Sequence, residues 1–148
     1  MGQLKLEIRK TIRAGQSRVF DAWTHPEIMR EWWGPKGVTC IGVEMDSRVG
    51  GKYRIGNALP DGKEIWIAGE FIQVTRPEIL QFTWCIEDAG GKSVPGVEIE
   101  LVTVSFKSLG DQTEIFIFHE KIGSEAAQKA HQEGWEGCLS GLENYVSI

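Results

Sequence analysis

The sequence contains no apolar run that approaches a membrane span and no cluster of basic residues. A transmembrane helix needs roughly 20 consecutive apolar residues, and no segment of the chain comes near that length. Lys and Arg number 16 against 21 Asp and Glu, and the net charge is -5. Nucleic-acid-binding proteins normally carry a basic stripe. We therefore expect neither a membrane span nor a nucleic-acid partner.

Cysteine is also scarce. Cys40, Cys85 and Cys138 are odd in number and widely spaced, which is not the pattern of a disulfide framework, and we expect free thiols in a reducing cytoplasm. Residues 1–10 alternate apolar and charged side chains. That alternation is typical of a strand and not of a signal peptide, so we expect a cytoplasmic protein.

The composition is that of an ordinary globular domain. Hydrophobic residues make up 41% of the chain and charged residues 25%, which argues against disorder. A chain of 148 residues buries a substantial core without disulfides or metals. We expect a single domain over residues 1–148.

Alternating apolar residues and turn chemistry predict an antiparallel meander. Expected strands cover 4–12, 38–45, 51–55, 64–74, 79–86, 97–106 and 113–120, and Gly, Pro or Asp residues fill the connections between most of them. Two short helices follow the first strand: one begins near Ser17, and Pro26 opens the second, which ends at Trp32. Short connections between sequential strands favour an α+β fold with an antiparallel sheet.

The last and longest predicted helix begins after Ser124 and ends near Val146. Beside an apolar stripe it carries a second stripe of small residues: Ala127, Ala130, Gly134, Gly137, Cys138 and Gly141. Each glycine inside a helix costs about 1 kcal/mol relative to alanine. Either the sheet backbone approaches closely here, or space is left for a ligand. We expect the second, in which case replacing Gly141 by leucine fills the space and stabilises the protein.

The histidines do not have the spacing of a metal site. His25, His119 and His131 lack a Cys or His neighbour at metal-ligand spacing, so we expect no metal and no cofactor. His131 and Cys138 lie on one helix face but about 10 Å apart along the axis, too far for a direct hydrogen bond. We assign no catalytic residue.

Two glutamates have an ambiguous position. Glu98 and Glu100 share the strand parity of Val102 and Val104, which would point two carboxylates among apolar side chains and perturb their pKa values. A bulge or an edge position would instead place them in water. We favour the solvated position.

Aromatic pairs raise a similar question. Phe116 and Phe118 lie on the strand face opposite Ile115 and Ile117, so they are candidates for a self-association patch and a homodimer. Of the adjacent Trp32-Trp33 pair, we expect only one ring to face inward squarely, while the other either caps the cavity mouth or is exposed.

Several motifs together resemble a known family. They begin with Val19-Phe20-x-x-Trp23-Thr24-x-Pro26 and Trp32-Trp33-Gly34-Pro35, continue through Val49-Gly50-Gly51-x-Tyr53 and Thr113-x-Ile115-x-Ile117-x-His119, and end with Gly134-Trp135-x-x-x-Leu139. In this order they resemble the family of activator of heat-shock protein 90 ATPase homologues, within the START-like (SRPBCC) superfamily. The resemblance implies a helix-grip fold: a curved antiparallel sheet of six to seven strands wrapped around a long C-terminal helix.

The resemblance also implies a ligand site between that helix and the concave face of the sheet, because START-like domains commonly hold apolar molecules there. The candidate lining residues are Trp33, Tyr53, Trp66, Phe71, Trp84, His119, His131, Gly134, Cys138 and Gly141. We expect a binding module for an apolar or amphipathic small molecule, with apolar acids and polycyclic compounds among the ligands.

Two alternatives remain open. An enzyme of the cyclase or dehydratase type would use the same cavity, and an ionisable pair converging inside it would favour this alternative. A chaperone-related interaction module is the other. The eukaryotic co-chaperones of this branch carry an additional N-terminal domain that contacts the chaperone, and the present chain leaves no room for one, which argues against chaperone contact.

Overall fold

The computed structural model describes residues 3–35, 37–94 and 99–146. Its elements follow the expected order: β1 (Leu4–Ile12), α1 (Gln16–Thr24), α2 (Pro26–Trp32), β2 (Thr39–Met45), β3 (Lys52–Ala58), β4 (Glu64–Thr75), β5 (Ile79–Glu87), β6 (Glu100–Ser108), β7 (Thr113–Ile122) and α3 (Glu125–Val146). Two positions of the predicted sixth strand, Val97 and Glu98, lie outside the described residues.

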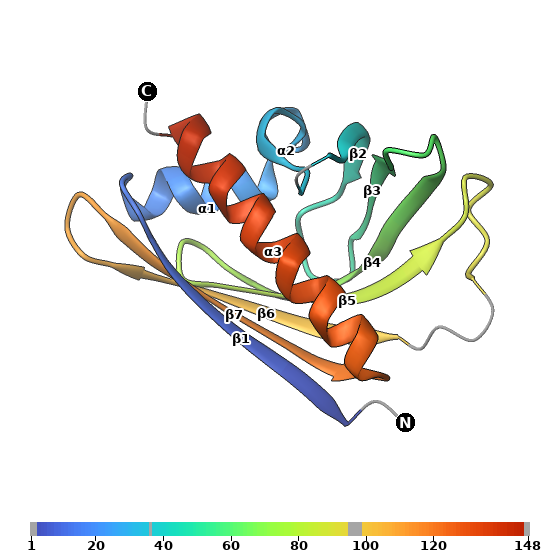
Figure 1. The fold of residues 1–148 in the computed structure, drawn as a ribbon. Coiled ribbons are helices and arrows are strands. Elements are labelled where there is room, and N and C mark those ends of the chain that lie inside the picture. The colour runs from blue at the N-terminus through green and yellow to red at the C-terminus, as the bar shows by residue number, and fades with distance from the viewer. Residues whose placement is uncertain (1–2, 36, 95–98, 147–148) are drawn as a thin grey trace.

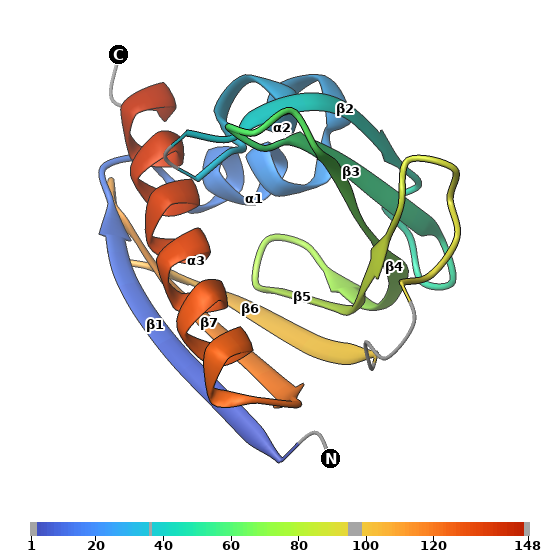
Figure 2. The same cartoon turned by 45° about the vertical axis from the view of Figure 1, so that its right-hand side comes forward.

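The strands form one antiparallel sheet in the order β1-β7-β6-β5-β4-β3-β2. The sheet curls around α3, which crosses the concave side diagonally, while α1 and α2 occupy one end of the concavity (Figure 1, Figure 2). The α+β helix-grip fold expected from the sequence is confirmed.

The core follows from the alternation of side chains along the strands. In β7 every second residue from Thr113 to His119 is buried, and β6 alternates in the same way from Glu100 to Phe106. Helix α3 turns Trp135, Leu139 and Leu142 toward this face. A strand sends successive side chains to opposite faces, so one apolar face of the sheet and one face of the helix close the core.

The helix ends have local causes. Pro26 occupies the first turn of α2, where a missing N–H costs no hydrogen bond. The Ser124 hydroxyl accepts a hydrogen bond from the Ala127 N–H at 3.1 Å, as expected for an N-cap. Of the two positions expected for the second ring of the Trp32-Trp33 pair, the exposed one is wrong. Both rings are buried, because Trp33 already has an extended backbone and its side chain leaves in a different direction.

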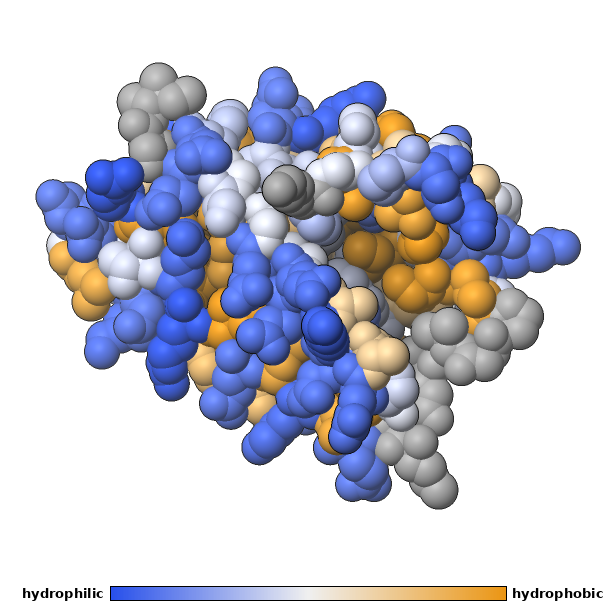
Figure 3. Space-filling view, viewed as in Figure 1, coloured by the Kyte–Doolittle hydropathy of each residue, from blue (hydrophilic) through white to orange (hydrophobic). Residues whose placement is uncertain are grey.

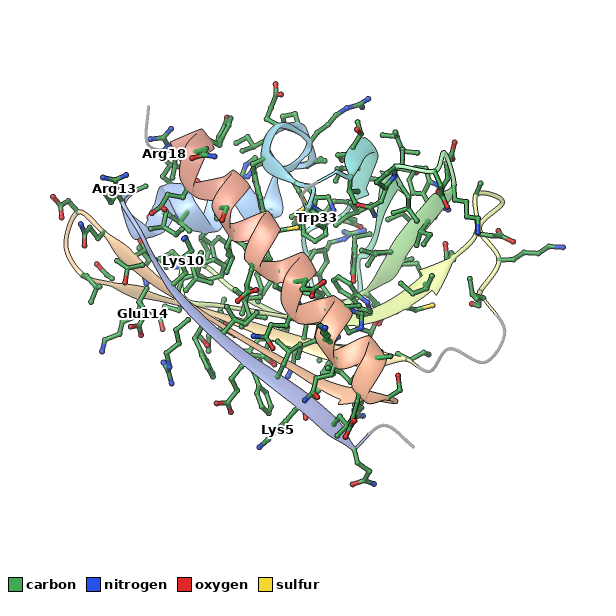
Figure 4. All side chains as sticks on the ribbon, viewed as in Figure 1. Lys5, Lys10, Arg13, Arg18, Trp33 and Glu114 are labelled. Carbon is green, nitrogen blue, oxygen red and sulfur yellow. The ribbon has the colours of Figure 1, made fainter. Side chains whose placement is uncertain are left out.

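Phe116 and Phe118 lie on the convex face and are half-buried. The Arg9 guanidinium lies 4.2 Å from the centroid of the Phe116 ring, and the Lys5 ammonium lies 5.6 Å from that of Phe118. Figure 4 shows Lys5 and Glu114 along this outer side of the sheet. Self-association through the two phenylalanines stays a prediction.

Across the described residues, no helix is long and apolar enough to span a membrane. Cys40, Cys85 and Cys138 are free thiols, and Cys138 is fully buried. Burial raises the pKa of the Cys138 thiol to about 12, so this cysteine is an unreactive packing residue at neutral pH.

Candidate functional site

A pocket of about 180 Å³ lies between α3 and the sheet. Helix α3 contributes Ala130, His131, Gly134, Trp135 and Cys138, and β3, β4 and β5 contribute Asn57, Ile65, Ile67, Trp84 and Ile86. Trp33, just after α2, also lines the pocket and points between α3 and the strands (Figure 4). The space-filling view shows an apolar hollow beside α3 (Figure 3).

Asn57 is a polar side chain of the wall, but its hydrogen bonds are used within the protein. Its Oδ1 accepts a hydrogen bond from Trp33 Nε1 at 2.9 Å, and its Nδ2 donates to the carbonyls of Ile55 and Ile65 at 3.2 and 3.3 Å. Asn57 therefore orients Trp33. The ionisable wall residues are His131 and the unreactive Cys138, and of these His131 offers a ligand a polar edge.

Behind His131 lies a buried polar cluster. Glu100 Oε1 is 2.7 Å from His119 Nε2 and 2.9 Å from His131 Nε2. The two imidazole rings stack, with centroids 4.4 Å apart and planes 19° apart. Trp84 packs edge-on against both rings. We call Glu100, His119 and His131 the Glu-His-His cluster.

The protonation of His119 follows from its partners. Trp135 Nε1 donates a hydrogen bond to His119 Nδ1 at 3.0 Å. An indole N–H only donates, so Nδ1 carries the lone pair and the ring proton of neutral His119 is on Nε2. That proton is donated to Glu100 Oε1.

The Glu100 carboxyl of the cluster is ionised. Burial raises the pKa of the Glu100 carboxyl, but His119 and His131 outweigh this effect and lower it to about 2. Burial also lowers the pKa of His119, against the opposing effect of Glu100. At neutral pH Glu100 is a carboxylate and His119 a neutral imidazole.

The solvated position that we favoured for Glu100 is wrong. Glu100 is 6% exposed and opens the buried alternation of β6 without a bulge. It pairs with Trp84 of β5, and the next inward residue, Val102, pairs with His119 of β7. Burial is tolerated because two imidazoles surround the carboxylate. Glu98 lies outside the described residues.

The cluster was missed in the sequence, although one signal was present. Glu100 and His119 each share strand parity with buried aliphatic residues, which predicts that both point inward. The sequence pattern did not reveal that β6 pairs with β7 or that α3 crosses these strands. These two arrangements bring residues 100, 119 and 131 together.

The Glu-His-His cluster also has the residue types of a metal site, and its ligand atoms all lie within 4.8 Å of one another. A metal needs the lone pair of Nε2, with the other ring nitrogen donating to a partner. His119 has the opposite arrangement, because Trp135 donates to Nδ1 and leaves the proton on Nε2. The donor set does not fit a metal ion.

Of the predicted lining residues, the main pocket includes Trp33, Trp84, His131, Gly134 and Cys138. Tyr53 and Phe71 line a second, water-sized space of about 20 Å³, which shares Trp33, Trp84 and Trp135 with the first pocket. His119 lies behind His131 and is fully buried.

Trp66 does not line the pocket. Its neighbours Ile65 and Ile67 do, so strand parity places Trp66 on the outer face. There its ring covers Gly56, where a Cβ would lie 2.6 Å from the indole, and the Arg54 guanidinium lies 4.4 Å from the ring centroid.

Gly141 does not line the pocket either. A Cβ at this position would lie 2.5 Å from the carbonyl oxygen of Trp32, so the glycine permits close approach of the backbone at the end of α2. A Cβ on Gly134 would lie 3.8 Å from Pro35 Cγ, an ordinary contact. The small-residue stripe therefore combines close packing at Gly141 with open space beside Gly134.

Comparison with known proteins bears on the fold. The family model described as "Activator of Hsp90 ATPase homolog 1-like protein" matches residues 13–147. Among solved structures, a protein from Chromobacterium violaceum is 25% identical, with a TM-score of 0.84 and 97% of both chains covered. The AHSA1 protein from Silicibacter pomeroyi is 19% identical, with a TM-score of 0.84, covering 97% of this chain and 98% of that one. No curated protein matches the sequence significantly.

Proposed function

Because the chain belongs to the activator of Hsp90 ATPase homologue 1-like family, whose START-like relatives commonly hold apolar molecules, we propose that it binds a small, largely apolar molecule between α3 and the sheet. The observation that carries the proposal is the apolar pocket with His131 in its wall. A concave apolar site with few polar groups is the usual form of a small-molecule site.

The volume limits the size of the ligand. An engineered apolar cavity of about 150 Å³ accommodates benzene, and drug-sized ligands occupy roughly 300–1,000 Å³. At about 180 Å³ the pocket suits a molecule of one or two rings. This is smaller than the polycyclic ligands that the sequence suggested.

The charge of the Glu100 carboxylate limits the chemistry of the ligand. Glu100 is ionised and lies directly behind His131, so an anionic group at the polar end of the pocket would meet a buried negative charge. We therefore propose an uncharged ligand whose polar group reaches His131, in place of the apolar acids expected from the sequence.

Thermal unfolding with 2-naphthol and 2-naphthoate as matched probes tests this proposal. At 100 times its dissociation constant, a ligand adds about 2.7 kcal/mol, or roughly 5–10 °C in melting temperature for a domain of this size. We expect 2-naphthol to raise the melting temperature and 2-naphthoate to have a much smaller effect.

A pair of leucine variants provides the control. Gly134→Leu places a side chain in the pocket, whereas Gln132→Leu places the same side chain on the exposed side of α3. The naphthol effect should be lost only in Gly134→Leu. Equal stabilisation of both variants would place the ligand elsewhere, and no effect on the wild-type protein would contradict the proposal.

An enzyme using the same pocket is the second candidate. The observation that favours it is the convergence of ionisable side chains beside the pocket: Glu100, His119 and His131.

A further inference from the structure

We propose that His131 is an acid/base residue that moves a proton on the molecule bound in this pocket, with Glu100 and His119 as positioning residues. The inference rests on the proposed function, because the substrate must first occupy the pocket. It assigns an activity to residues that would otherwise only shape a binding site.

Exposure assigns the roles. The side chain of His131 is 17% exposed and lines the pocket, whereas those of Glu100 and His119 are 7% and 0% exposed. A ligand in the pocket therefore meets His131 first. The other two residues act on the ligand only through it.

Glu100 prepares His131 to accept a proton. Its Oε1 lies 2.9 Å from His131 Nε2, so Nδ1 is the ring nitrogen not engaged with this carboxylate. When Nδ1 takes a proton, the resulting imidazolium lies against a carboxylate that is already ionised. A carboxylate behind a catalytic histidine orients the ring and stabilises its charged form.

His119 keeps the carboxylate in place. It receives a hydrogen bond from Trp135 and donates one to Glu100, so its own proton points toward the carboxylate and not toward the pocket. Glu100 itself is a poor base, because its pKa is about 2 and efficient proton transfer at neutral pH needs a base whose pKa lies closer to 7.

The chemistry is proton transfer without oxidation. The C–H bond of an activated carbon breaks and an N–H bond forms on His131. The electron pair stays on the substrate, where it is delocalised into a carbonyl group or expels a leaving group from the adjacent atom. His131 then returns the proton to the product or to water. The substrate class is an uncharged molecule of one or two rings with such an acidified C–H.

5-Nitrobenzisoxazole is a suitable probe, because it has two rings and no charge. Removal of the C–H proton of its isoxazole ring forms the third bond of a nitrile, breaks the N–O bond and releases a coloured phenolate. We expect the protein to accelerate this elimination. His131→Gln should lower the second-order rate constant by about 100-fold, the lower range for a general base. His25→Gln, which changes an exposed histidine, should leave it unchanged.

The pH profile tests the role of Glu100. Around His131, the ionisable groups are Glu100 from β6 and His119 from β7. In Glu100→Gln the charge behind His131 is lost, so the pH of half-maximal rate should fall along with the rate. A lower rate with an unchanged pH profile would show that Glu100 has a structural role only.

A binding measurement separates this inference from the proposed function. Unreactive 5-nitroindole has a similar shape, and its binding should quench the fluorescence of the pocket tryptophans Trp33, Trp84 and Trp135. Binding with equal elimination by wild type and His131→Gln would overturn the acid/base role and leave the binding proposal standing. Absence of binding would count against both. Elimination lost in Glu100→Gln but retained in His131→Gln would assign the base to Glu100 and overturn the proposal for His131.

Discussion

The indole N–H of Trp135 donates to Nδ1 of His119 across 3.0 Å, and this bond decides what the buried histidine can bind. Trp135 lies four residues after His131 on α3, so both side chains project from the same face of the helix. One turn of α3 therefore supplies the partner that orients His119 and the histidine that faces the pocket. The tautomer of His119 depends on a residue outside the Glu-His-His cluster.

Zinc binding tests this relationship. Because Trp135 keeps the proton on His119 Nε2, we expect Zn²⁺ at low equivalents to leave the melting temperature of the wild-type protein unchanged. In Trp135→Phe the donor is gone, and His119 can present the Nε2 lone pair beside Glu100 and His131. Zinc should then stabilise this variant more than the wild type. Zinc binding by the wild type that is lost in His119→Gln would contradict the tautomer assignment.

Acid unfolding reports on the charges of the same cluster. The pKa of Glu100 is about 2 in the folded protein against an ordinary value of 4.5. Its stabilising contribution is complete above 4.5 and is lost as the pH falls toward 2. The pKa of His119 is lowered, so the unfolded chain takes up this proton more readily, and stability also declines once the pH falls below about 6.5.

Urea unfolding across this pH range measures both effects. We expect the free energy of unfolding of the wild-type protein to fall on acidification, by a few kcal/mol between about pH 4.5 and pH 2. Glu100→Gln should have a lower free energy of unfolding at neutral pH. Its free energy of unfolding should also lack the steep decrease between pH 4.5 and pH 2. A variant with the wild-type pH dependence would show that Glu100 is not ionised in the folded protein.

The fold was accessible from sequence because its determinants are local. Alternation over 4–12, 64–74 and 113–120, interrupted by turn residues, gave strands whose observed limits differ by two residues or fewer. The start of α3 was similarly visible from Ser124, which caps it. Such signals depend on neighbouring residues alone.

The polar cluster was not accessible in the same way. For Glu100, strand parity indicated burial, but a bulge or an edge position would have placed the carboxylate in water. What resolves the conflict is a pair of imidazoles 19 and 31 positions further along the chain. No local pattern reveals such partners. For Trp66 the local pattern was sufficient: it alternates with Ile65 and Ile67, which line the pocket, so its ring lies on the other face of β4.

Trp66 supplies a test of this correction. Trp66→Ala removes an outer-face ring from above Gly56 and from beneath Arg54, so we expect a loss of about 1–3 kcal/mol in stability. Because the residue lies on the far side of β4 from the pocket, the affinity for 2-naphthol should not change. Trp84→Phe changes the pocket wall, so this variant should have an altered affinity for 2-naphthol.

Two leucine substitutions in one helix should have opposite effects on stability. At Gly141 the new side chain would meet the Trp32 carbonyl, because even a Cβ lies 2.5 Å from that oxygen. Gly141→Leu should therefore cost roughly 1–3 kcal/mol or more, the reverse of what the small-residue stripe suggested. At Gly134 the side chain enters open space, so Gly134→Leu should gain up to about 1 kcal/mol from helix propensity. Urea unfolding of both variants measures the difference, and a stabilised Gly141→Leu protein would show that the contact between α3 and the end of α2 is looser than the structure indicates.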